Sequence, residues 1–373
     1  MFGNSWRLGK LAGVEIRIDT SWVIVALLIT YSLYLQFTRA FERLAPPAAV
    51  LLAIISALMF FGSVLAHEMA HALTAKRRGI AVRGITLFLF GGATHAKVES
   101  RGPKDELVIS VVGPITSLVL GGILLALGFL GRDLFARPFS GALRYLGFVN
   151  LALGVFNMLP GFPLDGGRVL RSIVWRVTGS LSRATRVASI SGQVVGYLLV
   201  GLGVLFLVQG ELISAIWMAA IGWFLAQAAR SSYEELQVRR FLQDVEAEDL
   251  MSPGLVTIPS PLSVRDAVDR YFMRYDHGAF PVDEDGRTIG LLTLRGVKKL
   301  PQDEWPVHTV RDAMEPLGDQ CTVEVGARMD QVMAKLQKGG SGRCLVVRNG
   351  EVVGIITPSD ITRWLQRRRA LRD

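Results

Sequence analysis

Cysteine and charged residues are both scarce in this chain of 373 residues. Two cysteines, Cys321 and Cys344, do not make the disulfide framework of a small secreted protein. Asp, Glu, Lys and Arg form only 20% of the residues, against about a quarter in ordinary soluble domains. Half of the residues are apolar and the mean hydropathy is +0.37, which argues against a soluble globular protein. The sequence therefore predicts a membrane protein.

Six stretches of at least 18 residues contain no Asp, Glu, Lys or Arg. A helix needs roughly 20 apolar residues to cross about 30 Å of hydrocarbon, so each stretch can span or nearly span a membrane. The first stretch is long and no small-residue cleavage site follows it, so we expect a retained helix rather than a signal peptide. No comparable stretch follows Arg230. The six stretches are residues 20–38, 47–66, 107–131, 145–164, 187–210 and 212–229.

Positive charge is concentrated in the membrane half. Residues 1–230 contain 21 basic and 10 acidic residues, whereas residues 231–373 contain 20 basic and 22 acidic residues and resemble a soluble domain. A protein that binds nucleic acid gathers its basic residues on a soluble face, so this distribution argues against that class of partner.

The orientation of the spans follows from where the basic residues lie between them. If the N-terminus is inside, segments 1–19, 67–106 and 165–186 face the cytoplasm with 15 Lys and Arg, and the external segments hold five. Cytoplasmic loops carry such an excess of positive charge. We expect a multi-pass protein of the cell's plasma or inner membrane with both termini in the cytoplasm, where Cys321 and Cys344 stay reduced.

A His-Glu-x-x-His motif follows the second stretch and consists of His67, Glu68 and His71. On a helix the two histidines project from one face and can bind one Zn²⁺, while Glu68 is offset to reach a metal-bound water. A simpler interpretation makes them surface residues beyond the end of a membrane helix. Ionisable groups at membrane depth are functional as a rule, which favours the metal site.

A catalytic zinc needs a third protein ligand and an open position. Asp165 is the first charged residue after twenty without charge, in the segment Asn157–Gly167. The predicted orientation runs the second and fourth helices inward, so Asp165 falls at a depth similar to that of His67 and His71. The alternative is that Asp165 caps a helix beginning near Arg168, for which Asp-Gly-Gly is suitable.

The segments HEMAH and NMLPGFPLDGG resemble the site-2 protease family of intramembrane zinc metalloproteases, whose signatures are HExxH and NxxPxxPxDG. The resemblance covers about residues 8–230 and includes Gly113–Ser117 at the start of the third helix, where many relatives have Asn at the last position. It implies one Zn²⁺ per chain and a membrane-protein substrate with a single span. The implied roles are zinc ligands for His67, His71 and Asp165, general base and acid for Glu68, and contact with the reacting carbonyl for Asn157.

For Asn157 and for the segment 82–95, a second interpretation remains open. Asn157 can donate a hydrogen bond to the developing oxyanion, or it can be a turn residue before Pro160. The apolar segment 82–95, broken by Gly-Gly, predicts a strand or hairpin at the membrane interface. In the family such a sheet pairs with an unwound substrate, but it can also be purely structural. We expect His95 to be a polar loop residue after a strand rather than a ligand.

The soluble half contains an internal repeat. Residues 231–247 predict a connecting helix, after which Asp249–Pro253 recurs as Asp312–Pro316 and Gly290–Thr293 as Gly354–Thr357, at offsets of 63 to 65 residues. Each copy predicts strand, helix, strand, strand, helix, and two such copies bury a face against each other.

The repeat resembles a tandem pair of CBS domains, which commonly bind adenine nucleotides (ATP, ADP or AMP) between the copies. The family often holds phosphate or ribose with a Thr or Ser and an Asp after the last strand, a pattern that Thr357 and Asp360 fit in the second copy. The first copy keeps Thr293 but has Gly296 in place of the acid, so at most one site is implied. The alternative is a structural pair that dimerises the protein without a ligand. We expect a homodimer through these domains.

The predicted fold class is a polytopic α-helical membrane protein, with about six transmembrane helices and a small interfacial β hairpin or sheet, plus a cytoplasmic α/β tandem CBS pair. We expect an intramembrane zinc endopeptidase acting in regulated intramembrane proteolysis. A CBS-regulated transporter or channel predicts polar residues in several helices and repeats in the membrane half, which are not observed. A non-catalytic client-binding relative would have lost Glu68 or a ligand. The predicted domains are 1–230 (protease), 231–247 (linker helix), 248–306 (CBS 1) and 307–373 (CBS 2).

Overall fold

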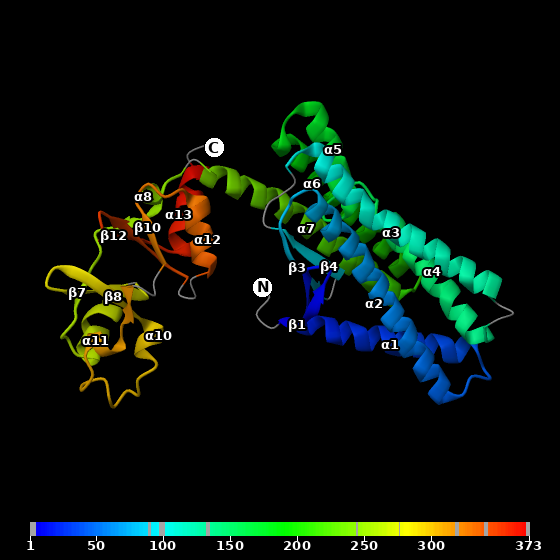
Figure 1. Cartoon of the computed structure of the whole chain (residues 1–373), viewed down its shortest axis with the longest axis horizontal. Helices are drawn as coiled ribbons and strands as arrows, with labels where there is room; N and C mark the ends of the chain where they lie inside the picture. The colour runs from blue at the N-terminus through cyan, green and yellow to red at the C-terminus, as the bar shows by residue number, and fades with distance from the viewer. Residues whose placement is uncertain are drawn as a thin grey trace. The chain divides into compact units, whose positions relative to one another are not determined.

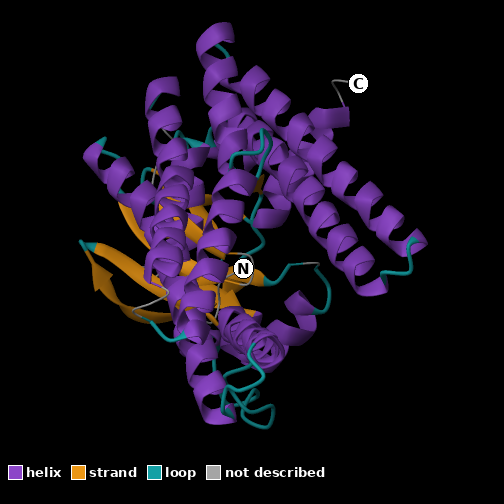
Figure 2. Cartoon of the chain, turned by 90° about the vertical axis from the view of Figure 1, so that its right-hand side faces the viewer, coloured by secondary structure: helices purple, strands orange, loops and turns teal. Residues whose placement is uncertain are grey.

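The computed structural model describes residues 5–88, 91–96, 101–131, 135–243, 245–275, 277–317, 321–338 and 342–370. It divides into two compact units, Met1–Glu235 and Leu236–Asp373. Long helices dominate the chain, and the strands form separate small sheets (Figure 1, Figure 2).

Six described helices are long and apolar enough to cross a membrane, which confirms the predicted fold class. A shorter helix, α5 (Asp165–Thr178), interrupts their series and ends where Gly179 adopts a left-handed backbone with φ of 65°. Proline in the first turn starts α2, α3 and α4, a position where its missing N–H costs nothing. The six are α1 (Thr20–Ala40), α2 (Pro46–Arg77), α3 (Pro103–Leu130), α4 (Arg137–Asn157), α6 (Leu181–Val208) and α7 (Leu212–Gln243).

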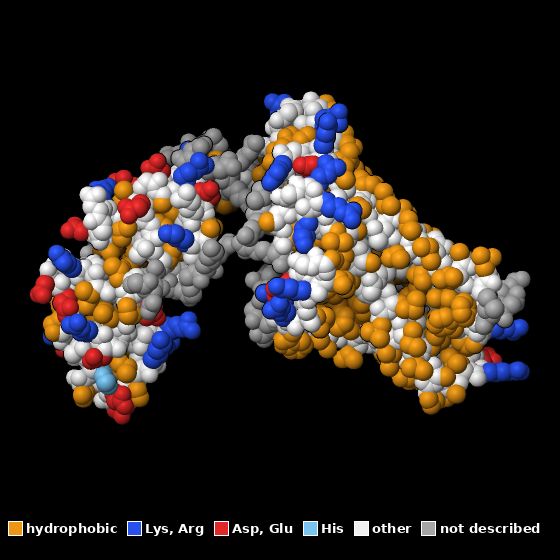
Figure 3. All heavy atoms as spheres, in the orientation of Figure 1, with side chains coloured by type: hydrophobic (Ala, Val, Ile, Leu, Met, Phe, Trp, Pro, Cys, Tyr) orange, Lys and Arg blue, Asp and Glu red, His pale blue; other side chains and the backbone are white. Residues whose placement is uncertain are grey.

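The sides of this helical bundle are apolar. Figure 3 shows hydrophobic side chains along the flank of the first unit, with Lys and Arg gathered towards its ends. Large apolar residues such as Ile213 and Val208 are about four-fifths exposed. Such a surface suits lipid. Its side chains are apolar, and helices satisfy their backbone polar groups internally without water.

The expected hairpin is part of a larger sheet in the first unit. β3 (Val82–Phe88) and β4 (Gly91–Ala96) form the antiparallel hairpin, and β3 also pairs in parallel with β2 (Val14–Asp19). β1 (Ser5–Leu11) completes the order β1-β2-β3-β4. His95 lies within β4, opposite Gly84, so its prediction as a loop residue was wrong; its side chain lies outside the described part of the structure.

The second unit contains two four-stranded sheets that exchange strands between the repeats. β5, at the start of the first repeat, pairs with β12 of the second, and β9, at the start of the second, pairs with β8 of the first. The strands are β5 (Ser252–Pro253), β6 (Ile258–Pro259), β7 (Ala279–Glu284), β8 (Arg287–Thr293), β9 (Glu315–Pro316), β10 (Cys321–Glu324), β11 (Cys344–Arg348) and β12 (Glu351–Ile356).

Helices complete each repeat, and equivalent turns have equivalent backbone. Asp285 and Asn349, 64 positions apart, both adopt a φ of 52° before a glycine of positive φ. The connecting helix predicted at residues 231–247 is not a separate element. Its residues continue α7, which ends at Gln243. The helices are α8 (Ala247–Leu250), α9 (Val264–Ala267), a π-helical turn (Val268–Phe272), α10 (Leu294–Val297), α11 (Val310–Ala313), α12 (Met329–Lys338) and α13 (Pro358–Ala370).

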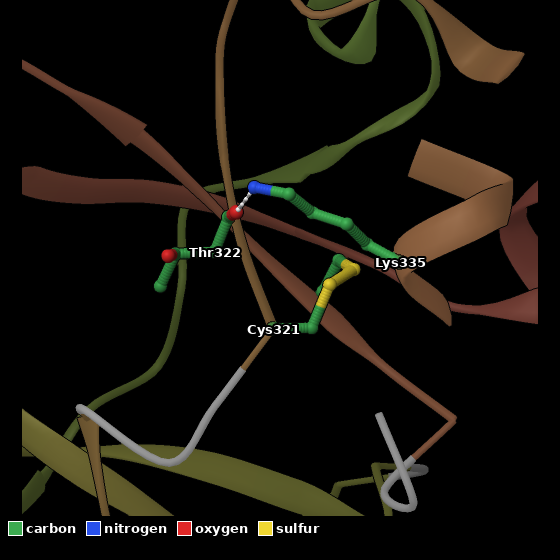
Figure 4. Close-up of a disulfide and its surroundings, with 4 residues drawn as sticks. Cys321, Thr322 and Lys335 are labelled. Carbon is green, nitrogen blue, oxygen red and sulfur yellow. Dashed lines mark hydrogen bonds between the residues drawn. A yellow bond between two sulfur atoms is a disulfide. The ribbon is translucent and has the colours of Figure 1, made fainter. Parts of the chain in front are cut away.

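The two cysteines form a disulfide, so the expectation that they stay reduced was wrong (Figure 4). Cys321 and Cys344 stand opposite each other on the parallel strands β10 and β11, and their Cα atoms are 4.6 Å apart. Beside them, Lys335 of α12 donates a hydrogen bond of 2.7 Å to the backbone oxygen of Thr322. The strand register brings together two residues 23 positions apart in the chain.

Candidate metal centre

The histidine motif lies in the last three turns of α2, between the sheet and α3. Met69 and Ala72 face the sheet and pack against Val14, Ile85 and Leu87. His67 and His71 project from another face of α2, towards α3, and both are buried. Residues four apart share one face of a helix. The apolar residues of these turns therefore pack against the sheet, while the two imidazoles face α3.

Asp165 reaches this place because α4 ends at Asn157. The prolines at 160 and 163 cannot continue that helix, and the chain turns before α5 begins at Asp165. Leu164, not Asp165, occupies the position before the first helical residue, and it makes no side-chain cap. The carboxylate of Asp165 instead bonds to both histidines, so the helix-capping interpretation of this residue does not hold.

Three donor atoms meet at one point. Nε2 of His67 and Nε2 of His71 each lie 3.1 Å from Oδ2 of Asp165, and the two nitrogens are 3.2 Å apart. Ligands on a tetrahedral zinc, at bond lengths of about 2.0 Å, are separated by roughly 3.3 Å. Within the described residues this is the one group of three or more His, Cys, Asp or Glu side chains that could hold a metal. The donor set of two imidazoles and a carboxylate fits zinc.

Both imidazole rings are oriented by α3. His71 Nδ1 lies 2.6 Å from the backbone oxygen of Ile109, which can only accept, so this nitrogen carries the proton. His67 Nδ1 lies 2.9 Å from Oγ of Ser117. This leaves the lone pair of His71 Nε2 for a metal, and the same holds for His67 when its Nδ1 donates to the Ser117 hydroxyl. Ser117, the last residue of the family-like segment Gly113–Ser117, thus makes a polar contact with a predicted ligand.

Gly113 of α3 has no room for a side chain. A Cβ there would lie 2.7 Å from Nε2 of His67 and closer still to Nε2 of His71. That is the space which an ion bound by both nitrogens needs. A glycine at this position therefore keeps the candidate metal position open.

The charge of Asp165 suits a metal ligand. Burial raises the pKa of its carboxyl, but its contacts with the His67 and His71 imidazoles lower the pKa by more and hold it well below its usual range. The carboxylate is therefore ionised at neutral pH, which is the form that binds metal ions.

The structure brings the three predicted ligands together and places Glu68 beside them, half-buried on α2. Asn157 is the half-buried last residue of α4, eight positions before Asp165. Sequence reasoning did not find the carbonyl of Ile109, because a backbone atom leaves no signal in the sequence. It also passed over Glu106, whose only signal was that it is the last charged residue before the third apolar stretch.

A cavity of about 340 Å³ lies in the second unit, lined by segments of both repeats. Thr357 and Asp360 both line it. Asp360 Oδ2 accepts hydrogen bonds from the backbone N–H and Oγ1 of Thr357 at 2.9 and 2.6 Å, and Oδ1 accepts one from Ser252 at 3.0 Å. Three basic side chains share the lining: His277, Arg343 and Arg363.

The equivalent place in the first repeat has Gly296 in place of the acid. Thr293 Oγ1 accepts a hydrogen bond of 3.0 Å from the N–H of Gly296. A Cβ at Gly296 would lie 2.7 Å from the backbone oxygen of Ala313, so an acidic side chain does not fit there.

Comparison with known proteins gives matches for both halves. The sequence profile of Peptidase family M50 matches residues 55–202, and that of the CBS domain matches residues 247–303 and 310–367. Zinc metalloprotease sll0528 of Synechocystis sp. is 35% identical over 97% of this chain and 96% of its own length. Zinc metalloprotease Rip3 of Mycobacterium tuberculosis is 36% identical over 96% of this chain and 92% of its own length. Among solved structures, the site-2 protease from Methanocaldococcus jannaschii is 24% identical with a TM-score of 0.43, over 62% of this chain and 95% of that chain.

Proposed function

Because the chain belongs to Peptidase family M50, the site-2 protease family of zinc metalloproteases, we propose that it cuts a peptide bond in or next to the transmembrane segment of a membrane protein. The single observation that supports the site is the triangle of donor atoms from His67, His71 and Asp165. The substrate we propose is a single-span protein, cleaved in regulated intramembrane proteolysis.

The chemistry follows from the donor set. A zinc ion bound there supplies a Lewis acid that lowers the pKa of a bound water towards about 7 and polarises the scissile carbonyl. Glu68 accepts the proton of the attacking water and delivers it to the leaving amine nitrogen. Asn157 donates a hydrogen bond to the oxygen that gains negative charge. Asp165 and the two histidines would hold the zinc ion through their donor atoms.

The sheet supplies a means of presenting the substrate. A transmembrane helix hides its peptide bonds in internal hydrogen bonds, so a substrate must unwind before hydrolysis. Among the described strands β4 pairs only with β3, which leaves its other edge for an added strand. We propose that an unwound substrate segment pairs with β4, next to the histidine motif.

Zinc content tests this proposal first. We expect detergent-purified protein to hold about one zinc per chain, the number that a three-ligand site of this kind binds. The variants His67→Ala and Asp165→Ala should lose it, and Asp330→Asn, an exposed acid of α12, should not. Absence of zinc from folded wild type after zinc is supplied would contradict the protease and move the transporter and client-binding alternatives forward.

Cleavage tests the reaction itself. The probes are purified single-span reporter proteins mixed with the zinc-loaded enzyme in detergent micelles. We expect the wild type to generate new termini within or next to a reporter's transmembrane segment, detected by mass spectrometry. Glu68→Gln should abolish these products and keep zinc, whereas Glu211→Gln, an exposed acid outside the site, should keep both. Equal cleavage by Glu68→Gln would remove Glu68 from the mechanism.

We propose that the cavity of the second unit binds an adenine nucleotide and thereby regulates the protease. Burial lowers the pKa of the Arg343 guanidinium, with Glu315 opposing the shift, which marks a cation partly stripped of water. Arg343 and Arg363 can contact phosphate, and Asp360 can accept from a ribose hydroxyl. Apolar residues of the lining, such as Val256 and Ile355, can contact the base.

Equilibrium dialysis of the full chain with ATP, ADP and AMP tests the nucleotide site. We expect one of them to bind once per chain, because only the second repeat has the acid. Asp360→Ala should abolish binding, and the exposed control Asp330→Asn should leave it unchanged. If none of the three binds, the CBS pair is structural.

We also propose that the protein is a homodimer through its CBS domains and lies in the plasma or inner membrane with both termini in the cytoplasm, where the Cys321–Cys344 disulfide is an exception to the reduced state of most thiols. The domain division 1–230, 231–247, 248–306 and 307–373 belongs to the same proposal. Light scattering of the detergent-purified chain tests the dimer. A mass of one chain at all protein concentrations would contradict it.

A further inference from the structure

A buried ion pair joins the helix that begins with Asp165 to the helix that faces both histidines. Arg171 of α5 donates from Nε to Oε1 of Glu106 on α3 at 2.6 Å, and Nη2 contacts the same oxygen. The Glu106 side chain is fully buried and that of Arg171 is 11% exposed. In the described part of the chain the other oxygen, Glu106 Oε2, is buried without a partner. Arg171 therefore compensates the charge of Glu106 there.

A buried pair of this kind is not explained by stability alone. Removing two charges from water is costly, and apolar side chains of similar volume often stabilise a fold as well or better. Arg171 makes one more contact, because its Cζ lies 5.1 Å from the ring centre of Phe162 in the turn before Asp165. Arg171 thus connects α3, the turn that leads to the third ligand, and the ligand's own helix.

Glu106 lies on the face of α3 that supports the other two ligands. Residues 106, 109, 113 and 117 are spaced three or four apart and share one helical face. Ser117 holds the ring of His67, and the carbonyl of Ile109 holds the ring of His71. Through Arg171, Glu106 holds the helix of Asp165. One face of α3 therefore contacts all three ligand-bearing segments.

Asp165 depends on its backbone for its position. In the described structure its carboxylate bonds only to the two histidine rings, whereas each ring has a second partner on α3. Arg171 lies six residues further along α5, about 9 Å along the helix axis. We propose that Glu106 and Arg171 are the positioning pair of the third ligand: they hold α5 against α3 so that Asp165 reaches both histidines. This role rests on the proposed zinc site.

A neighbouring ion pair offers a matched control. Arg78, just after α2, donates to Asp105 in the first turn of α3 at 2.7 Å, one residue before Glu106. Its side chains are 39% and 23% exposed, so solvent screens the pair and its loss costs little. This pair also links two segments of the site region, but within the described residues it has no hydrogen bond or ion pair to α5.

The experiment compares Glu106→Gln/Arg171→Gln with Arg78→Gln/Asp105→Asn in the full chain. Removing both partners leaves no unpaired buried charge, which gives the first variant the best prospect of folding. Zinc affinity is measured by competition with a chelator, and ligand geometry by the visible spectrum of bound Co²⁺. We expect the first variant to lose about 10- to 100-fold in zinc affinity and to change its Co²⁺ spectrum. The control pair should match the wild type in both.

Further variants separate positioning from folding. Gel filtration and thermal unfolding in a chelator show whether the metal-free protein keeps its fold. If the neutral pair does not fold, Glu106→Asp keeps both charges but shortens the reach by one methylene, and we expect the same spectral change. Arg171→Lys should bind zinc more tightly than Arg171→Gln, because the ammonium can still reach Glu106.

The outcomes distinguish this inference from the proposed function. Wild-type affinity and spectrum in the folded Gln/Gln or Glu106→Asp variant would overturn the positioning role and leave the zinc site standing. If the wild type itself takes up neither Zn²⁺ nor Co²⁺, the zinc site is wrong and the positioning role is wrong with it.

Discussion

Single residues of α3 decide whether a metal can enter between the two histidine rings. Ser117 and the carbonyl of Ile109 set the ring orientations, and Gly113 leaves the space between them open. None of these three residues is a proposed ligand. A substitution of Ser117 or Gly113 can therefore change metal binding while every ligand remains.

Gly113→Ala should prevent zinc binding without unfolding the protein. Its Cβ would overlap the two Nε2 atoms, and a clash with histidine side chains can be relieved by turning the rings away from the metal position. Gly122→Ala is the control, because on the same helix its Cβ meets nothing within 4 Å. Elemental analysis of both purified variants checks this. Full zinc occupancy in Gly113→Ala would show that α3 moves to relieve the overlap and that the histidine rings stay in place.

At the scale of elements, the turn between α4 and α5 is held against α6. The N–H of Phe162 donates to the backbone oxygen of Ala188 at 3.1 Å, and the hydroxyl of Ser191 donates to that of Pro160. Gly192 allows this approach, because a Cβ there would overlap the oxygen of Phe162. The packing of α6 thus contributes to where α5, and with it Asp165, begins.

Gly192→Ala should destabilise the protein by about 1–3 kcal/mol and lower its zinc content. The added methyl meets backbone rather than a flexible side chain, so the turn must move. Thermal unfolding and metal analysis measure the two effects. Gly201→Ala, with open space on the same helix, should change neither. A Gly192→Ala protein with wild-type stability would mean that α6 can withdraw from the turn.

The strands β10 and β11 are joined by the Cys321–Cys344 disulfide, which closes a short loop of the chain. Constraining a loop of this length in the unfolded state contributes roughly 3 kcal/mol. We therefore expect a reducing dithiol to lower the unfolding temperature of the full chain. The variant Cys321→Ser should start at the lower temperature and not respond to the dithiol. Peptide mapping without reductant should recover the linked peptides, and their absence would contradict the disulfide.

At the scale of the whole molecule, the distribution of positive charge predicts how the six helices are oriented. Fusion of a fluorescent protein to the C-terminus should give fluorescence, because such a protein folds in the cytoplasm. Alkaline phosphatase fused after Arg43, in the first external segment, should be active because it requires export. Active phosphatase at the C-terminus would reverse the proposed orientation.

The sequence predicted best those elements that depend only on residues close together in the chain. The uncharged stretches at 20–38 and 47–66 lie within α1 and α2, because length and hydropathy alone make a span. The fourth stretch, 145–164, agrees less well, since α4 begins at Arg137 and ends before Pro160. The strands β1 and β2 were missed. β1 is largely exposed, whereas β2 alternates apolar and polar residues from Val14 to Asp19, a strand signal that was overlooked.

The sequence by itself determined the membrane spans, the histidine motif and the internal repeat, because each is a pattern of residues at fixed short spacing or fixed offset. Only the tertiary structure decided that Asp165 meets histidines 94 and 98 positions away, that Glu106 pairs with Arg171, and that Cys321 reaches Cys344. Those contacts depend on how helices pack and how strands register, and no single segment of the chain encodes its distance to another.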